Sequence, residues 1–149
     1  MAKENDFYQI SLKAILKNDK GEVLGLEGAK GGSYEGFYDL PGGRIDKNEF
    51  TVPLIEILKR EIREEIGDVE FIIEDRPVAV GRHLLKPYIS YESQNTPVLY
   101  LFYEAKYEGG DVNFSDEHND YKWLALEAVD LEKYFTSGIL EGMRMYLKN

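Results

Sequence analysis

The hydrophobic and polar residues of the chain alternate in its first part and repeat at helical spacing in its middle. Residues 8–16 begin with apolar and polar side chains in alternation, which is typical of a strand with one buried face. A turn-forming cluster at 18–21 separates them from a second strand-like run at 22–26, so we expect these two segments to form a β-hairpin. Residues 28–43 include six glycines, and we expect mainly a loop there, with at most a short strand at 37–40.

The clearest helix is predicted for residues 54–66. Its apolar residues recur at three- and four-residue spacing. Gly67 follows as the residue expected to end the helix in a left-handed conformation. Pro53 suits the first turn, and Thr51 is a candidate N-cap.

The second half of the chain is predicted to contain four strands and a helical C-terminus. The strand candidates are residues 69–73, 78–85, 98–105 and 121–124, the last of which follows an acidic loop at 109–120. Residues 126–147 are predicted to form one or two helices with a break near Gly138. No repeat, low-complexity tract or linker is visible, so we expect residues 1–149 to form a single α+β domain.

Composition argues against several classes of partner. The 149 residues include 18 Lys and Arg against 28 Asp and Glu, a formal net charge of −10. Such a chain repels phosphate backbones and anionic lipids unless basic residues are segregated, so we expect neither a nucleic-acid duplex nor a membrane as a partner. The absence of an apolar span or a signal-like N-terminus favours a cytoplasmic protein. Because there is no Cys, thiolate chemistry is excluded, and oxygen ligands, nitrogen ligands or a hard cation remain.

Three carboxylates stand together on the predicted helix. At about 100° per residue, Glu61, Glu64 and Glu65 fall on one arc at the edge of the apolar stripe. Like charges at these spacings repel one another by a few tenths of a kcal/mol, and the C-terminal part of a helix disfavours each anion by about 0.3–1 kcal/mol. A compensating cation would offset these costs, and several oxygen ligands suit Mg²⁺ or Mn²⁺. For an isolated helix, an exposed face of Glu–Arg ion pairs would be the simpler interpretation.

The segment around this helix resembles the Nudix box. That family's pattern is Gly, five residues, Glu, seven residues, and then Arg-Glu-apolar-x-Glu-Glu-x-Gly-apolar. Gly43 and Glu49 match the first half, and residues 60–67 match the second half position for position.

Two positions depart from the family's pattern. The spacer, residues 50–59, is ten residues long rather than seven, and Asp68 stands at the final apolar position. Three residues added inside the helix would rotate its ends by about 300°, whereas the same residues before Pro53 would only lengthen the loop. We expect the second arrangement, which preserves the carboxylate set and leaves the role of Glu49 open.

The resemblance implies an α/β/α sandwich around a mixed β-sheet. It also implies hydrolysis of a diphosphate bond in a nucleoside diphosphate linked to another group, with Mg²⁺ or Mn²⁺ as cofactor. Glu61 and Glu65 are the expected principal metal ligands, with Glu64 and Gly43 completing the site. Such an acidic site repels its own substrate until cations bind, so strict metal dependence is expected.

The catalytic residues implied by the resemblance are Arg60, Glu61, Glu64 and Glu117. Arg60 is expected to orient the carboxylates, because Glu56 lies one turn before it and Glu64 one turn after it. The general base is either Glu61 or, from the acidic loop, Glu117. A solvated acidic turn is the alternative for that loop.

Substrate contacts are expected near the glycine-rich segment. Phe37 and Tyr38, together with Tyr34, are candidates for stacking on a nucleobase. Arg44 and Arg82 are candidate phosphate clamps, with surface ion pairs as the alternative for each.

Three other residues are assigned structural roles. His83 is expected to be a hydrogen-bonded residue of an apolar strand, and His118 to be exposed. Trp123 is expected in the core of a strand.

Two functions from different classes stay open. The first is a pyrophosphohydrolase acting on a nucleoside triphosphate, a dinucleoside polyphosphate or a nucleotide sugar, and the second is a Nudix-fold module that binds or senses a nucleotide without hydrolysing it. The isomerase branch that acts on isopentenyl diphosphate is disfavoured because its chemistry is associated with a catalytic Cys. The sequence does not select one substrate, and it leaves a homodimer as open as a monomer.

Overall fold

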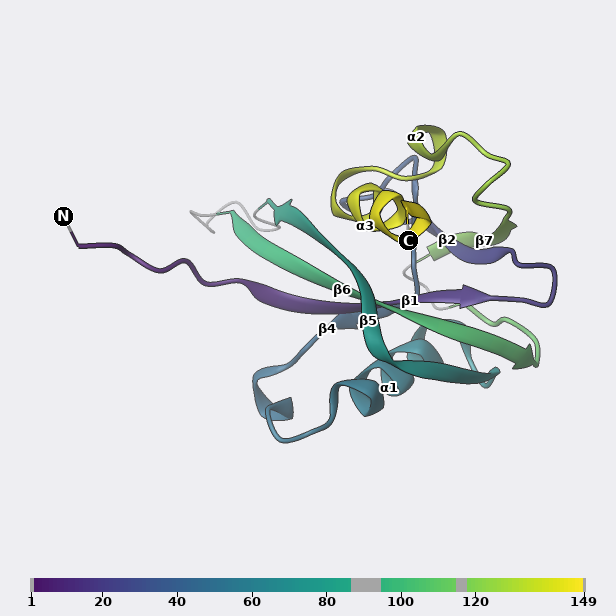
Figure 1. Ribbon diagram of the computed structural model, residues 1–149, viewed down its shortest axis with the longest axis horizontal. Helices are drawn as coiled ribbons and strands as arrows, with labels where there is room; N and C mark the ends of the chain where they lie inside the picture. The colour runs from purple at the N-terminus through teal and green to yellow at the C-terminus, as the bar shows by residue number, and fades with distance from the viewer. Residues whose placement is uncertain (1, 87–94, 115–117, 149) are drawn as a thin grey trace.

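The computed structural model describes residues 2–86, 95–114 and 118–148. Within these residues, seven strands form one mixed sheet, with α1 on one face and α2 and α3 on the other (Figure 1). This arrangement confirms the predicted α/β/α sandwich. In chain order the elements are β1 (Gln9–Lys17), β2 (Val23–Gly28), β3 (Tyr38–Asp39), β4 (Gly42–Arg44), the 3₁₀ turn η1 (Lys47–Glu49), α1 (Leu54–Ile66), β5 (Glu70–Leu85), β6 (Thr96–Gly109), β7 (His118–Leu124), α2 (Leu131–Tyr134) and α3 (Ser137–Lys148).

The centre of the sheet is the parallel pair of β1 and β6. The strand order is β3-β2-β1-β6-β5, with β4 paired to β1 and β7 paired to β2, and the strand pairs other than β1–β6 are antiparallel. The register of β4 sets Leu12 opposite Gly43 and Lys13 opposite Gly42. The glycine pair Gly42–Gly43 therefore lies against the central strand.

Two apolar clusters hold the layers together, one on each face of the sheet. Alternate residues of β1 serve both clusters, because successive side chains of a strand point to opposite faces. Leu12 and Leu16 pack with the buried residues of α1, whereas Ile15 packs with Phe102 and the α3 residue Met143. Each fully buried side chain of this kind contributes about 1.5–3 kcal/mol.

Helix α1 has the predicted bounds, and its start differs in one detail. Pro53 occupies the N-cap position without a side-chain hydrogen bond, so the predicted cap by Thr51 is wrong. The chain turns at residues 50–52 before the helix begins, which leaves the helical spacing intact. The helix ends as predicted, at Gly67 with φ 83°, whose N–H donates to the Arg63 carbonyl oxygen.

Several strands differ from their predicted extents, and β6 is longer than residues 98–105 at both ends. One continuous strand, β5, replaces the two predicted at 69–73 and 78–85, because bulges around Pro77 keep it paired with β6 where proline cannot donate a hydrogen bond. Strand β4 forms inside the predicted loop, and β7 begins at His118 rather than at residue 121. The C-terminal helices are two, separated just before Gly138 as predicted.

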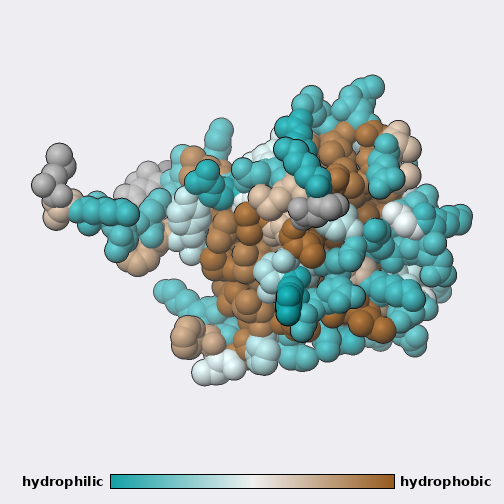
Figure 2. All heavy atoms as spheres, in the orientation of Figure 1, coloured by the Kyte–Doolittle hydropathy of each residue, from teal (hydrophilic) through white to brown (hydrophobic). Residues whose placement is uncertain are grey.

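One face of the molecule carries mostly hydrophilic side chains. Figure 2 shows hydrophilic side chains over most of the visible face, with apolar areas between them. The edge strand β5 exposes Ile72, Val80 and Leu84. No helix in the described part of the chain is long and apolar enough to cross a membrane.

Candidate active site

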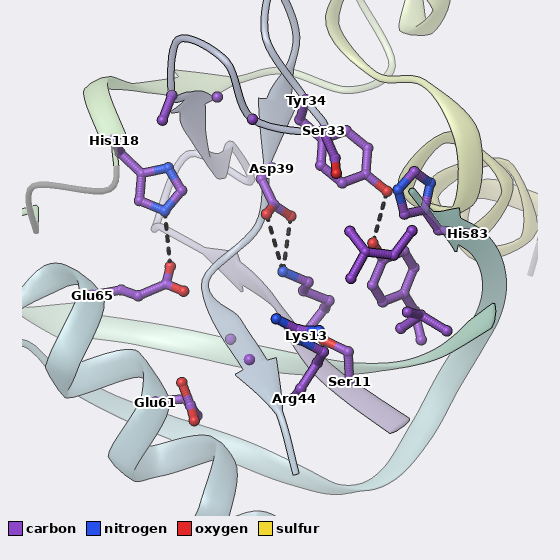
Figure 3. A pocket seen from close by; sticks show the side chains of 18 of the residues that line it. Ser11, Lys13, Ser33, Tyr34, Asp39, Arg44, Glu61, Glu65, His83 and His118 are labelled. Atoms are coloured by element: carbon purple, nitrogen blue, oxygen red, sulfur yellow. Dashed lines mark hydrogen bonds and ion pairs between the residues drawn. The ribbon is translucent and has the colours of Figure 1, made fainter. Parts of the chain in front are cut away.

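A cavity of about 820 Å³ lies between α1, β1, β4, β5, β6 and the glycine-rich loop that follows β2. Its volume is in the range of small-molecule binding sites, which is about 300–1,000 Å³. We call the part formed by Glu61, Glu65 and His118 the acidic end. In Figure 3 these three residues lie on one side of the cavity, and Tyr34 and His83 lie on the other.

The acidic end gathers two of the three predicted helix carboxylates. Glu61 and Glu65 are one turn apart on α1, face the cavity, and have side chains 16% and 12% exposed. Glu64 is 58% exposed, contacts Arg60 and does not line the cavity, so of the three predicted helix carboxylates only Glu61 and Glu65 face it. Burial raises the pKa of both Glu61 and Glu65. Among the residues that the structure describes, no three His, Asp or Glu side chains form a ready-made metal cluster.

The glycine pair of β4 allows the strand to pass close to both α1 and β1. A Cβ at Gly43 would lie 2.2 Å from Glu61 Oε2 and would displace that carboxylate. Gly42 has φ +148°, and a Cβ there would lie 1.9 Å from the Leu12 carbonyl oxygen. A side chain is therefore excluded at each glycine for a different reason: at Gly43 by the Glu61 carboxylate, and at Gly42 by the backbone of the central strand β1.

Arg60 forms ion pairs with three carboxylates next to the acidic end. Its guanidinium lies 2.6 Å from Glu49 Oε2, 2.9 Å from Glu64 Oε1 and 3.2 Å from Glu61 Oε1. The predicted partner Glu56 instead pairs with Lys59.

Glu49 reaches Arg60 despite the longer spacer. Its second oxygen accepts the backbone N–H of Asp46, which closes a capping box around the η1 turn. That backbone bond, followed by the contact with Arg60, lowers the pKa of Glu49. Glu49 thus fastens Arg60 to the turn that precedes α1.

His118 closes the acidic end from β7. Its Nδ1 donates to the Glu27 carbonyl oxygen over 3.2 Å, and its Nε2 lies 3.3 Å from Glu65 Oε2 without an aligned hydrogen bond. Only 8% of the side chain is exposed, so the expected exposure of His118 is wrong. Burial would lower the pKa of His118, but Glu65 outweighs this effect and raises it.

The middle of the cavity is occupied by an ion pair that the sequence analysis missed. Lys13 Nζ lies 3.0 Å from Asp39 Oδ1 and 3.1 Å from Oδ2 (Figure 3). Burial would lower the pKa of Lys13, but Asp39 and Glu65 raise it, so the ammonium stays charged.

We call Tyr34, His83 and Tyr100 the ring end of the cavity. The hydroxyls of Tyr34 and Tyr100 are 2.8 Å apart, and the His83 ring lies 5.2 Å from that of Tyr34. His83 Nδ1 contacts Ser137 Oγ at 2.7 Å, whereas its Nε2 is buried without a hydrogen-bond partner among the described residues. Burial lowers the pKa of His83, so its ring is neutral near pH 7. Ser137 has φ 53°, the one non-glycine residue with positive φ in the described chain.

The other predicted substrate contacts are dispersed. Arg44 lines the cavity and donates to Gln9 Oε1 at 2.8 Å, whereas Phe37, Tyr38 and Arg82 do not line it. Tyr38 packs instead against Tyr134 of α2, with ring centroids 5.9 Å apart. Arg82 is exposed, and its backbone N–H donates to Glu141. The predicted base Glu117 lies outside the described residues.

Comparison with known proteins identifies the family of the chain. The model of the NUDIX domain matches residues 8–143. The chain belongs to the Nudix family. Its membership confirms the predicted resemblance and makes the chain a Nudix pyrophosphohydrolase.

Individual Nudix relatives are distant in sequence. The nucleoside triphosphatase NudI of Escherichia coli O81 (strain ED1a) is 28% identical over 121 residues, which cover 80% of this chain and 82% of that protein. The crystal structure of a MutT protein from Methanosarcina mazei Go1 has a TM-score of 0.73 at 25% identity, covering 98% of this chain and 97% of that one. An Ap4A hydrolase of C. elegans has a TM-score of 0.61 at 20% identity, covering 94% of this chain and 96% of that one, and shares the fold.

Proposed function

We propose that this Nudix protein hydrolyses nucleoside triphosphates with the help of Mg²⁺ or Mn²⁺. The diphosphate bond is broken by addition of water, giving a nucleoside monophosphate and pyrophosphate. The observation that supports this best is one cavity with carboxylates at one end and aromatic rings at the other. Such a cavity fits a ligand that has a planar base and a phosphate chain. The similarity to NudI, which is named a nucleoside triphosphatase, points to the same substrate class.

The residues of the acidic end fit a hard divalent cation. Mg²⁺ usually binds one or two carboxylates and completes its shell with water and substrate phosphate oxygens, so Glu61 and Glu65 suffice. Both carboxylates are poorly solvated, and Glu65 Oε2 makes no aligned hydrogen bond. When bound, the cation neutralises phosphate charge and makes water more acidic.

The surrounding side chains orient these ligands. Arg60 contacts Glu61 and Glu64, so it fixes the position of the helix carboxylates rather than touching substrate. His118 does the same for Glu65 within the acidic end. We assign the general base to Glu61, because it faces the cavity, with Glu117 as the alternative.

The ring end binds the base of the nucleotide in this proposal. Tyr34, His83 and Tyr100 supply flat surfaces, and the apolar side chains of Leu85 and Val98 line the same cavity. Aromatic rings prefer offset or edge contacts with one another, and a base can use either. Arg44 is placed with the phosphate chain, because its cation lines the cavity beside Gly43.

A substrate panel tests the proposal. Nucleoside triphosphates, dinucleoside polyphosphates and nucleotide sugars are incubated with Mg²⁺ or Mn²⁺, and the products are measured by mass and by released pyrophosphate. Triphosphates should be the best substrates, and Glu65→Gln should lower kcat/KM about 100-fold or more. The matched control is Glu56→Gln, which removes a carboxylate of the same helix outside the cavity. Nucleotide binding without hydrolysis by the unaltered protein would favour the binding module instead.

A further inference from the structure

The cavity contains a buried charge that neither the metal site nor the ring end explains. Among the described residues, Ser11 and Lys13 are the polar or charged residues that are buried. They are two positions apart on β1, so they share one face of the strand, and both line the cavity. In Figure 3 the Lys13 ammonium lies between the acidic end and the ring end.

Stability is a weak reason for a lysine at this position. Removing an ammonium and a carboxylate from water costs several kcal/mol for each ion. The attraction between the two ions often does no more than offset this cost. Apolar residues of similar volume are commonly as stable as a buried ion pair. The next residue on the same face, Ile15, is apolar and fully buried.

The hydrogen bonds of the pair leave Lys13 with capacity for a ligand. An ammonium has three donors, of which one donates to Asp39 Oδ2 at 3.1 Å, while Asp39 Oδ1 lies 3.0 Å away as an ion-pair contact. The remaining contact, to the Leu40 carbonyl oxygen, is 3.4 Å long. Asp39 is anchored independently, because its Oδ1 accepts the Leu40 backbone N–H at 2.7 Å. Asp39 can therefore hold Lys13 in place while one donor turns toward a ligand.

We propose that Lys13 binds the phosphate that joins the nucleoside to the rest of the substrate, and that Asp39 is the counter-ion of Lys13 when no phosphate is bound. This inference rests on the proposed function. Lys13 Nζ lies 5.6 Å from the centre of the Tyr100 ring at one end, and it is attracted by Glu65 at the other. A nucleotide with its base at the ring end and its outer phosphates at the acidic end lays its first phosphate between them, beside Lys13.

The Lys13→Met/Asp39→Asn double variant separates this role from a structural one. It removes both charges of the pair together, so neither partner is left as an unpaired ion, and the Asn side-chain oxygen can still accept the Leu40 N–H. The probes are the nucleoside monophosphate and the free nucleoside of the best substrate, measured by calorimetry with Mg²⁺. The dissociation constant of the monophosphate should rise about 10- to 100-fold, the effect of one charge-assisted hydrogen bond, while that of the nucleoside should stay the same. Equal weakening of both ligands, or no weakening of the monophosphate, would overturn the proposal.

Asp39→Asn alone supplies a second test that keeps Lys13. Monophosphate binding should then be as tight as in the unaltered protein or tighter, because the ammonium loses its competing carboxylate. A loss of 10-fold or more would contradict the assignment, and this measurement decides the matter if the double variant does not fold. Because binding is measured without turnover, adenosine monophosphate can serve as the probe if no triphosphate is hydrolysed. Failure of the proposed function is therefore distinguishable from failure of the Lys13 assignment.

Discussion

The two ends of the cavity differ in whether they stabilise a positive charge, and the pKa values of the two histidines of the chain show the difference. At the acidic end, Glu65 outweighs the effect of burial and raises the pKa of His118. At the ring end, His83 has hydroxyl and aromatic neighbours, and burial lowers its pKa. The first environment stabilises a cation, and the second favours a neutral ring. One cavity can therefore hold both a metal–phosphate group and a base.

The largest predicted effect is the difference between a glutamate of α1 that faces the cavity and one that is exposed to solvent. Glu61→Gln should lower kcat/KM about 100-fold or more, because it removes a charged oxygen that faces the cavity. Glu64→Gln should lower it by less than about 10-fold, because Glu64 is 58% exposed and contacts Arg60 instead. Steady-state kinetics with one triphosphate measures both. Equal losses would mean that Glu64 contributes to the site as much as Glu61 does, which the cavity lining does not predict.

Metal binding at the acidic end should stabilise the folded protein even when no substrate is present. At about 100 times its dissociation constant, Mg²⁺ or Mn²⁺ adds about 2.7 kcal/mol to the free energy of unfolding. For a chain of this size the melting temperature should rise by roughly 5–10 °C. Differential scanning fluorimetry measures the shift, which Glu65→Gln should abolish and His83→Phe should retain. A shift that survives Glu65→Gln would locate the metal elsewhere.

A smaller effect is expected at Ser137, which supports the ring end. Ser137→Ala removes the hydroxyl that contacts His83 but keeps a side chain at φ 53°, whereas Ser137→Gly removes the hydroxyl and relieves the backbone strain. Both variants should raise KM by about 2- to 10-fold and alter the order of preference among four triphosphates. Only the glycine variant should match the unaltered protein in thermal stability. An unchanged order of preference in both would show that His83 does not depend on Ser137.

The histidine pKa values give the smallest and most local test. An NMR pH titration of the metal-free protein should show His118 titrating above the ordinary imidazole range and His83 below it. Between the two pKa values, His118 is charged and His83 is neutral. Glu65→Gln should bring the pKa of His118 down and leave His83 where it was. The reverse order of the two pKa values would contradict the electrostatic difference between the ends.

The acidic end could be predicted from the sequence because most of it is local. Glu61 and Glu65 belong to one helix whose periodicity is strong, and Gly43 precedes it at the spacing of the Nudix box. The helix wheel could not separate Glu64 from its neighbours, because the three carboxylates share one arc. Their separation depends on which side of that arc the sheet covers.

The residues in the middle and at the ring end of the cavity could not be predicted without the tertiary structure. Lys13 occupies a polar position in an alternating strand, and alternation cannot distinguish a solvated face from the floor of a cavity. Tyr34, His83 and Tyr100 come from three separate segments, which only the sheet brings together. The register that sets Ser11 beside Tyr100 on neighbouring strands is a tertiary property. An apolar strand that contains His83 gave one signal, but it suggested a structural role.

One kinetic comparison tests most directly whether the acidic end serves catalysis and the ring end serves binding of the base. Glu61→Gln and His83→Phe are assayed on the same triphosphates with saturating Mg²⁺, and kcat and KM are determined separately. The expected result is that Glu61→Gln lowers kcat with a small change in KM, whereas His83→Phe raises KM, alters base preference and leaves kcat nearly unchanged. A fall in kcat of the same size in both variants, with base preference unchanged, would contradict it.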